Sequence, residues 1–293
     1  MRQLNWVRTL VSFLCIALPT VVHAGVVSLG TAANYAVFGL AGSETITNSA
    51  VTITGNEGIS QGGAIANNAP SKVIGNAYEY SSGQFTGPGT LTGSLVTSTS
   101  TLVQNDADVA TALSEISGLA ATQTLGCSIT TATTLTGNGG LNVIKVNGGI
   151  NLNNANLTLT GSSSDYFVVD VTGNVSLVGT ATLALGGGVT ANHVIYDFTS
   201  TSGSFATNVG DVVNGTLLAA APGFTYSLDG TFNGEIIGDG SISLLSNATV
   251  SQLGFSGYTP PPTVPEPSSI LLLGSGLSCA GILRQRLKRA IAG

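Results

Sequence analysis

The feature that most constrains the fold is a recurring pattern of short strand-like runs, each closed by glycine or asparagine. Within a run, apolar residues alternate with small polar ones, which places them on opposite faces of a strand. Examples are residues 51–54 (VTIT), 141–146 (LNVIKV), 156–160 (NLTLT) and 166–171 (YFVVDV). The pattern predicts an all-β protein with one strand about every 8 to 12 residues, in a sandwich or a solenoid.

Three properties of the chain favour the solenoid. Gly and Asn stand at nearly every break, and Asn tolerates the left-handed conformation that tight corners need. Only 8% of residues are charged, against roughly 25% in an average chain, as expected for uncharged stacks along the coils. Aromatic residues make up 6%, which predicts an interior of Val, Ile, Leu and Ala ladders. No fixed-length repeat is present, so the solenoid should be irregular.

One stretch departs from the β pattern and predicts a helix from about residue 101 to 117, packed along the β body. Ser100 or Thr101 is suited to cap its start, and Gly118 is suited to end it. Its apolar positions recur at the spacing of an amphipathic stripe: Leu102, Val109, Leu113, Ile116 and Ala120.

Charged residues are unevenly distributed along the 293 residues. Residues 25–263 contain only two bases, Lys72 and Lys145, and thirteen acids, a net charge of −11. Nucleic-acid binding is excluded as a function, because neutralising phosphates requires clusters of Lys and Arg. A mean hydropathy of +0.40 argues against a disordered chain. Three cysteines are too few for a disulfide-stapled mini-protein.

The N-terminus has the form of a secretory signal peptide, residues 1–24. Two arginines lie at its start, and an apolar run follows at residues 10–18. Small residues precede the expected signal peptidase site, between Ala24 and Gly25. The run is too short to span a bilayer, which needs about 20 residues. An uncleaved anchor is the alternative.

The C-terminus has three parts after a Pro-rich linker at residues 258–263. An apolar run at 270–283 would reach about 21 Å as a helix, against about 30 Å of hydrocarbon, so snorkelling or bilayer thinning must compensate. Basic residues after the run should stay cytoplasmic. The motif before the run is Val264, Pro265, Glu266 and Pro267, and the basic tail after it contains Arg284, Arg286, Lys288 and Arg289.

This tail, residues 264–289, resembles the PEP-CTERM protein-sorting signal, also known as the ice-binding protein C-terminal domain. The resemblance implies processing by an exosortase of Gram-negative bacteria, with cleavage near the Pro-Glu-Pro motif. It also implies that the C-terminal helix tethers the chain to the inner membrane only transiently. The body would then be released to the cell surface or the exopolysaccharide matrix. A plain membrane anchor is the alternative.

The body, residues 25–257, resembles the ice-binding-like (DUF3494-type) adhesin domain, and about equally the choice-of-anchor A family. The matching segments are residues 29–38 (LGTAANYAVF), 53–60 (ITGNEGIS), the Asn105-Asp106 pair of the predicted helix, 213–219 (VNGTLLA) and 233–237 (NGEII). The resemblance implies a right-handed β-helix of triangular cross-section with one long helix alongside.

Catalysis is not predicted for the body. The mature chain has one histidine, His193, which is too few for a multi-histidine metal site. Cys127 lies in a Thr-rich run that suits a structural cysteine better than a nucleophile paired with His193. The sequence has no Walker-type phosphate-binding loop. We therefore predict no catalytic residues, no metal and no cofactor.

A polysaccharide-degrading β-helix enzyme is the enzymatic alternative. Glycoside hydrolysis needs two carboxylates at a defined separation, and a lyase would also need a nearby base. The body has only two bases to supply one. Coiling can bring together four candidate carboxylates: Asp165, Asp170, Asp197 and Asp211.

Threonine pairs suggest a binding face, because alternation places both members of a Thr-x-Thr pair on one side of a strand. Such a face can order water and bind ice, although Thr is also a common strand residue wherever a sheet meets solvent. The main prediction is an exported surface or matrix protein with a structural or adhesive body, possible partners being exopolysaccharide or ice. Ice binding is the alternative function. The candidate residues are Thr45, Thr47, Thr52, Thr54, Thr134, Thr136, Thr158 and Thr160.

Overall fold

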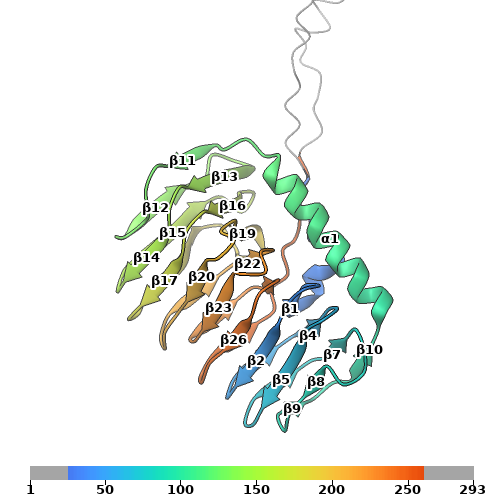
Figure 1. Ribbon diagram of the computed structural model, residues 1–293. Helices are drawn as coiled ribbons and strands as arrows, with labels where there is room; N and C mark the ends of the chain where they lie inside the picture. Colours follow the sequence, from blue (N-terminus) through green and yellow to red (C-terminus); the bar gives the residue numbers. More distant parts are fainter. Residues whose placement is uncertain (1–25, 261–293) are drawn as a thin grey trace, which may run out of the picture. The chain divides into compact units, whose positions relative to one another are not determined.

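The computed structural model describes residues 26–260, which form a parallel β-solenoid with three sheets and one α-helix (Figure 1). The predicted solenoid is therefore confirmed. All strand pairs between the named strands are parallel, as in a chain that coils repeatedly in one direction. The predicted signal peptide, sorting motif, apolar run and basic tail lie outside the described residues.

The largest sheet has ten strands and is the one against which the helix packs. Its strands are short, and most face apolar residues inward to the solenoid core. In spatial order the ten-stranded sheet comprises β10 (Leu95–Thr97), β7 (Ala77–Glu79), β4 (Asn56–Ile59), β1 (Tyr35–Gly39), β25 (Ile236–Gly238), β22 (Thr216–Ala219), β19 (Val194–Phe198), β16 (Tyr166–Val171), β13 (Leu141–Val146) and β11 (Gln123–Leu125).

The other two sheets form the remaining faces of the solenoid. The nine-stranded sheet comprises β12 (Thr133–Thr136), β15 (Asn156–Gly161), β18 (Thr182–Gly187), β21 (Val212–Asn214), β24 (Thr231–Asn233), β27 (Thr249–Ser251), β3 (Thr52–Thr54), β6 (Lys72–Ile74) and β9 (Thr90–Leu91). The eight-stranded sheet comprises β14 (Ile150–Asn153), β17 (Val175–Val178), β20 (Ser204–Ala206), β23 (Thr225–Leu228), β26 (Ile242–Leu244), β2 (Thr45–Ser49), β5 (Ala64–Asn68) and β8 (Phe85–Thr86).

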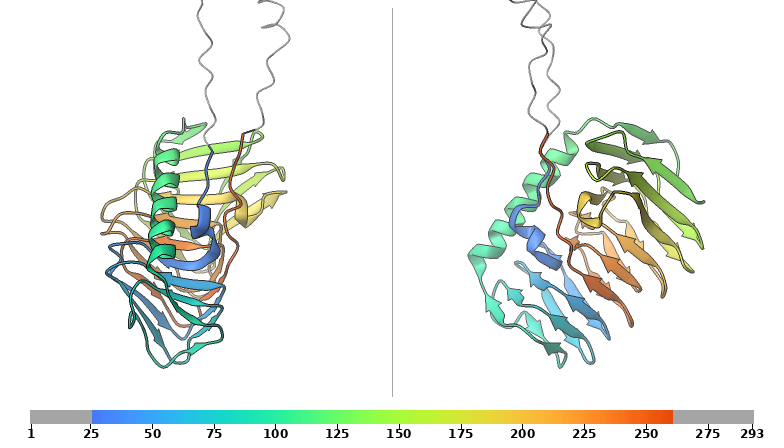
Figure 2. Two further views of the ribbon diagram at one scale, coloured as in Figure 1. Left: turned by 90° about the vertical axis from the view of Figure 1, so that its right-hand side faces the viewer. Right: turned by 180° about the vertical axis from the view of Figure 1, so that it is seen from behind.

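The coils are not stacked in sequence order. Strands β1, β2 and β3 begin in the middle of the solenoid, and the chain winds from there to the end that carries β8, β9 and β10. Helix α1 (Thr99–Ser117) then runs back along the ten-stranded sheet, and the strands from β11 onward wind toward the middle (Figure 2). The last coil, β25 to β27, pairs with the first, β1 to β3.

Helix α1 occupies the predicted region, and its buried side chains include Leu102, Val109, Ala112 and Ile116. Its N-cap is Ser98, so the prediction of Ser100 or Thr101 as the cap was wrong. Gly118 is the C-cap, as predicted. Two short 3-10 helices, η1 (Gly30–Asn34) and η2 (Ala191–His193), complete the helical elements of residues 26–260.

The solenoid interior is filled by apolar ladders in which partner residues of successive coils stack on one another. The ladder Leu157, Leu183, Val213 is an example of the predicted aliphatic filling. The prediction of an interior of only Val, Ile, Leu and Ala was wrong where two successive coils meet, because Phe198, Phe205, Phe224 and Tyr226 form an aromatic cluster there with ring centroids 5.1 to 6.3 Å apart. Within the described residues 26–260, the strand pairings and the two hydrophobic clusters join into one compact unit that ends at Thr259.

The corners of the coils explain the irregular repeat. Register partners such as Leu141 and Tyr166 are further apart in sequence than Leu217 and Ile236, because the connecting loops differ in length. Sixteen glycines among residues 26–260 have positive φ, a conformation that other residues adopt at a cost. Asn154 and Asn247 also have positive φ, in agreement with the role expected of asparagine at corners.

Candidate functional site

The three sheets differ in charge, which narrows the search for a binding face. The strands of the eight-stranded sheet carry no charged residue, and those of the nine-stranded sheet carry only Lys72. The ten-stranded sheet contains five charged residues, and part of its outer face is covered by α1: Glu57, Glu79, Lys145, Asp170 and Asp197. Two faces, one uncharged and one with a single lysine, are therefore free of the helix.

Threonines of the nine-stranded sheet stand in register from coil to coil. Thr231, Thr249 and Thr52 are direct partners, and neighbouring strands lie about 4.8 Å apart. The Thr249 hydroxyl donates to the Thr231 hydroxyl across 3.4 Å. The full outward column, called here the first column, is Asn156, Thr182, Val212, Thr231, Thr249, Thr52, Lys72 and Thr90.

A second outward column lies two residues further along the same strands. Asn214 and Asn233 are linked side chain to side chain at 2.9 Å, so this column is also ordered along the stack. Its members in register are Thr134, Thr158 and Ala184 at one end and Asn214, Asn233, Ser251, Thr54 and Ile74 toward the other. Together the columns form a grid in which most side chains are short and polar, interrupted by Val212, Lys72, Ala184 and Ile74.

The structure separates the predicted threonines into two groups. Thr45 and Thr47 lie on β2 of the eight-stranded sheet, so the eight residues do not form one surface. The other six belong to the nine-stranded sheet: Thr52, Thr54, Thr134, Thr136, Thr158 and Thr160. Sequence analysis did not single out four threonines of the first column, because each has no second threonine on the same face within its own strand: Thr90, Thr182, Thr231 and Thr249.

The eight-stranded sheet offers a weaker grid. Its central outward column is made of smaller residues, with serine and alanine in most places where the other sheet has threonine. Its members are Asn151, Ser176, Ala206, Ser227, Ser243, Thr47, Ala66 and Thr86. The nine-stranded sheet is therefore the better candidate for a face that binds through ordered hydroxyl and methyl groups.

The structure does not assemble the residues considered for catalysis. Only Asp170 and Asp197 are register partners, whereas Asp165 and Asp211 lie at coil corners, where they accept backbone N–H groups. The ring of His193 stacks on Tyr166 with centroids 4.0 Å apart. Within residues 26–260 no group of three or more His, Cys, Asp or Glu side chains is placed to hold a metal ion.

Two glutamates, Glu57 and Glu235, are buried, and burial raises the pKa of each. Burial raises the pKa of Glu57 to about 7, although hydrogen bonds from Asn48 at 3.0 and 3.1 Å lower it. Burial likewise raises the pKa of Glu235 to about 8, against bonds from the Phe255 N–H and the Thr216 hydroxyl. Both carboxyl groups therefore bind protons at neutral pH far more readily than exposed glutamates do.

Comparison with known proteins identifies the body. A family model described as ice-binding-like matches residues 40–251. The chain belongs to the ice-binding-like family. A second family model, the PEP-CTERM protein-sorting motif, matches residues 263–286 and marks the chain as an exported protein that is anchored in the membrane before processing. A search of curated proteins finds no match.

Solved structures with the same fold include several ice-binding proteins. One from an Antarctic biological consortium has a TM-score of 0.57 and 23% identity, covering 80% of this chain and 94% of that one. The ice-binding protein LeIBP from an Arctic yeast has a TM-score of 0.60 and 18% identity, covering 82% and 98%. The DUF3494 domain of a Shewanella frigidimarina ice-binding protein has a TM-score of 0.57 and 19% identity, covering 78% and 100%. At sequence identities of 18% to 23%, the structural similarity establishes the fold alone.

The family and its solved relatives are ice-binding proteins rather than enzymes. Within residues 26–260 no helix is long and apolar enough to cross a membrane.

Proposed function

We propose that this ice-binding-like protein binds ice through its nine-stranded sheet. The observation that carries the proposal is the first column, where threonines of successive coils stand in register on an almost uncharged sheet. Threonine offers a hydroxyl that hydrogen-bonds water and a methyl group that excludes it. Repetition of both groups at the coil spacing gives water a fixed lattice of anchoring points.

The test uses residues 25–260, in thermal-hysteresis and ice-recrystallisation assays. Thr249→Tyr places a bulky ring in the middle of the first column, and because Thr249 is exposed the core is unaffected. Its matched control is Ser227→Tyr, at an exposed position on the eight-stranded sheet. We expect the first variant to lose most of the activity of the parent and the second to keep it.

Two results would contradict this proposal. If the unmodified protein shows no hysteresis and no effect on recrystallisation, the body does not bind ice. If the Ser227→Tyr variant loses activity while Thr249→Tyr keeps it, the eight-stranded sheet is the binding face.

The sorting tail supports a proposal about location. Exosortase would cut near Pro265, Glu266 and Pro267, and the body would then reside at the cell surface or in the exopolysaccharide matrix. Intact-mass measurement of the extracellular form should give a protein that lacks both residues 1–24 and the basic tail. A form of full length, or unchanged surface accumulation after deletion of residues 264–289, would contradict this location.

An adhesive role in the matrix is the second candidate function. It is supported by the sorting motif together with a body whose two helix-free sheets are almost uncharged. Retention of purified residues 25–260 on the exopolysaccharide of the producing strain, undiminished in the Thr249→Tyr variant, would favour it.

A further inference from the structure

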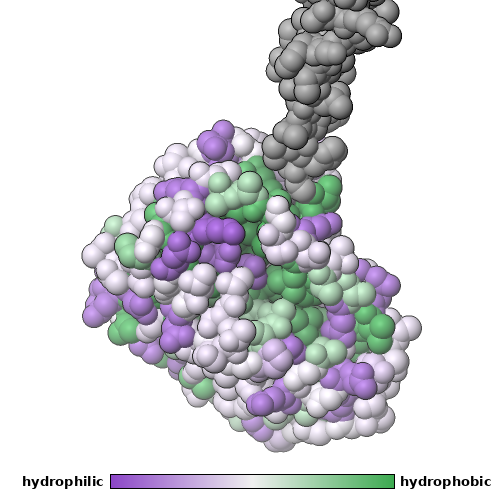
Figure 3. All heavy atoms as spheres, turned by 45° about the horizontal axis from the view of Figure 1, so that its top comes forward, coloured by the Kyte–Doolittle hydropathy of each residue, from purple (hydrophilic) through white to green (hydrophobic). Residues whose placement is uncertain are grey.

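A groove runs beside α1 on the outer side of the ten-stranded sheet. It consists of two adjoining hollows of about 330 Å³ and 160 Å³, which share Leu113 of the helix and Ala220 after β22. Both are open to solvent, and the larger is at the lower end of the size range of small-molecule sites. On the surface drawn in Figure 3, hydrophobic residues gather in a central band bordered by hydrophilic groups. We call these joined hollows the acid-ended groove, because carboxylates lie at both ends and apolar residues between them.

Asp197 lies at one end of the acid-ended groove and is 5% exposed. Its neighbours on β19, Tyr196 and Phe198, face the solenoid core, so alternation directs Asp197 outward to the groove. No residue among 26–260 donates a hydrogen bond to its carboxylate, and burial raises its pKa to about 7, with a contribution from the charge of Asp170. A carboxyl group that is almost fully buried, faces a hollow and has no partner within residues 26–260 is suited to bind a cationic group there.

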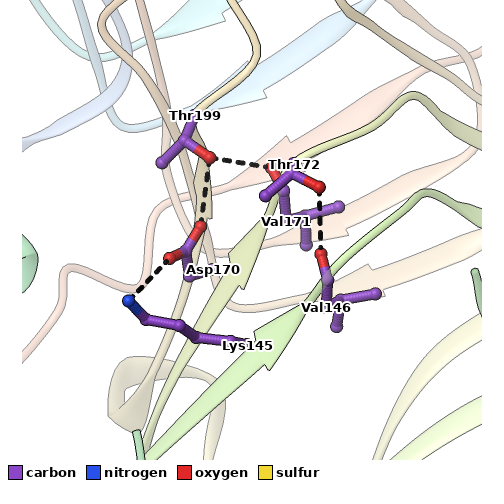
Figure 4. Close-up of polar contacts among 6 residues, drawn as sticks. All are labelled: Lys145, Val146, Asp170, Val171, Thr172 and Thr199. Carbon is purple, nitrogen blue, oxygen red and sulfur yellow. Dashed lines mark hydrogen bonds and ion pairs between the residues drawn. The ribbon is translucent and has the colours of Figure 1, made fainter. Parts of the chain in front are cut away.

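Asp170, the register partner of Asp197, is already compensated. The Lys145 ammonium lies 4.0 Å from its carboxylate, and the Thr199 hydroxyl donates to it at 3.1 Å (Figure 4). Lys145 and Lys72 are the only Lys or Arg among residues 26–260, and neither lines the groove. The described chain therefore supplies no cation for Asp197.

The other end of the groove carries Asp106 of α1 and Asp239, which follows β25. Asp106 accepts hydrogen bonds from the Ala41 N–H and the Ser60 hydroxyl. Asp239 Oδ1 is buried and has no hydrogen-bond partner among residues 26–260. Burial raises the pKa of both groups, and the charge of Asp106 raises that of Asp239 further. This end also lacks positive charge.

The strand register gives the separation of the two ends. Asp197 pairs with Leu218, and Gly238 pairs with Ala219, so Asp239 lies two strands and two residues away from Asp197. Two strand spacings are about 10 Å and two residues along a strand about 7 Å, which places the two positions about 12 Å apart. An extended chain advances about 1.2 Å per bond, so about nine or ten bonds cover this distance.

We propose that the acid-ended groove binds a linear aliphatic diamine or polyamine, with one ammonium group on Asp197, the other on Asp239, and the methylene chain against Leu113 and Ala220. The two ammonium groups of such a ligand would neutralise the carboxylates at the ends of the groove. Its methylene chain would contact the apolar residues between them. Aliphatic amines with pKa values near 10 remain protonated when these carboxyl groups ionise. The proposal is independent of ice binding, which uses another sheet.

The pH dependence of binding follows from the groups around Asp197. These are Asp170 on β16, Lys145 beyond it, and Tyr226, whose pKa burial raises and the charge of Asp197 raises further. The helix residues that line this end, Leu113 and Ser117, do not titrate. Affinity should therefore weaken from pH 8 to pH 5, as Asp197 takes up a proton.

The test uses 1,8-diaminooctane, whose two nitrogens are nine bonds apart, with purified residues 25–260, calorimetry and amide NMR spectra. We expect binding, with shifts concentrated at Thr199, Ala220 and Ala221, and weaker binding of 1,8-octanediol and of diamines too short to span the groove. Asp197→Asn should weaken binding at least about tenfold, the effect of losing a charged hydrogen bond. Asp229→Asn, in a turn outside the groove, is the matched control and should bind as the parent does.

The control for folding is thermal unfolding of Asp197→Asn, which replaces a buried, unpartnered acid by its neutral isostere. Equal affinity for diamine and diol, or for the parent and Asp197→Asn, would overturn the proposal. So would shifts confined to other surfaces, or no binding at pH 8. Displacement of the diamine by oligolysine with higher affinity would assign the groove to a basic polypeptide instead. Unchanged diamine binding by Thr249→Tyr would show that the site is separate from the ice-binding face.

Discussion

Replacing Glu57 by glutamine is expected to stabilise the solenoid at alkaline pH and to have little effect at acidic pH. Glu57 is fully buried on β4, where its two carboxylate oxygens accept only the amide of Asn48. Asn48 Oδ1 and Asn67 Nδ2, on neighbouring coils, have no partner within the described chain. A glutamine keeps an acceptor for Asn48, adds a donor that Asn48 Oδ1 can accept, and cannot ionise.

The magnitude follows from the pKa. Burial raises the pKa of Glu57 from 4.5 to about 7. Because the folded-state pKa lies above the unfolded one, the stability contributed by the protonated group is complete below pH 4.5 and is lost as pH rises to about 7. A difference of one pKa unit corresponds to about 1.4 kcal/mol. Between pH 5 and pH 8.5 the free energy of unfolding of the parent should therefore fall by about 2 to 3 kcal/mol relative to that of Glu57→Gln. For a domain of this size that corresponds to a difference of about 5 to 10 °C in Tm.

The assay is thermal or urea unfolding of residues 25–260 across this pH range, with Glu44→Gln as the matched control. Glu44 is exposed and accepts only the Ser241 hydroxyl, so its variant should follow the parent at every pH. Parallel profiles for Glu57→Gln and the parent would show that Glu57 is ionised in the folded protein without cost. Destabilisation of Glu57→Gln at pH 8.5 would refute the reasoning outright.

Three further predictions concern stability, each measured by urea unfolding. Leu102→Ala opens a cavity between α1 and the ten-stranded sheet and should cost about 2 to 5 kcal/mol, whereas a cost below 1 kcal/mol would mean that the helix contributes little. Asp108→Ala removes the acceptor of the Thr31 N–H and hydroxyl, at 2.7 and 2.6 Å, and should cost about 1 to 2 kcal/mol; no loss would show that solvent replaces both bonds. Burial raises the pKa of Asp165, but its hydrogen bonds outweigh burial and lower the pKa below its usual value. The ionised carboxylate therefore stabilises the folded protein, and this stabilisation is lost as the pH falls through the folded-state pKa. Asp165→Asn should be less stable at neutral pH and show a flatter acid limb, and an acid limb identical to that of the parent would contradict this assignment.

Local features of the fold could be predicted from the sequence because they depend on neighbouring residues. Alternation within runs such as 166–171 identified strands, and the spacing of Leu102, Val109 and Ile116 identified the helix. The stacking order could not be predicted, because the pairing of β1 with β25 depends on contacts between distant parts of the chain. The aromatic cluster formed by two successive coils was missed for the same reason.

The candidate site was only partly predictable because coil lengths vary. Thr-x-Thr pairs such as Thr158 and Thr160 are visible in one strand, whereas the alignment of Thr231 with Thr249 requires the register between strands. Asp197 follows a strand pattern that gives no sign of burial. It is buried because α1 passes over the outer side of its sheet, and the path of the helix is a tertiary property.

The return of the last coil to the first has a consequence for the order in which an exported chain can fold. Strands β25 to β27 join the two halves of the solenoid, and β27 ends at Ser251, shortly before the Pro-rich linker. During vectorial translocation these strands emerge last, so until then β1 to β3 present unpaired edges to which another chain can attach. The seam between the first and last coils, β1 to β3 against β25 to β27, can therefore close only after the last of these strands has left the membrane.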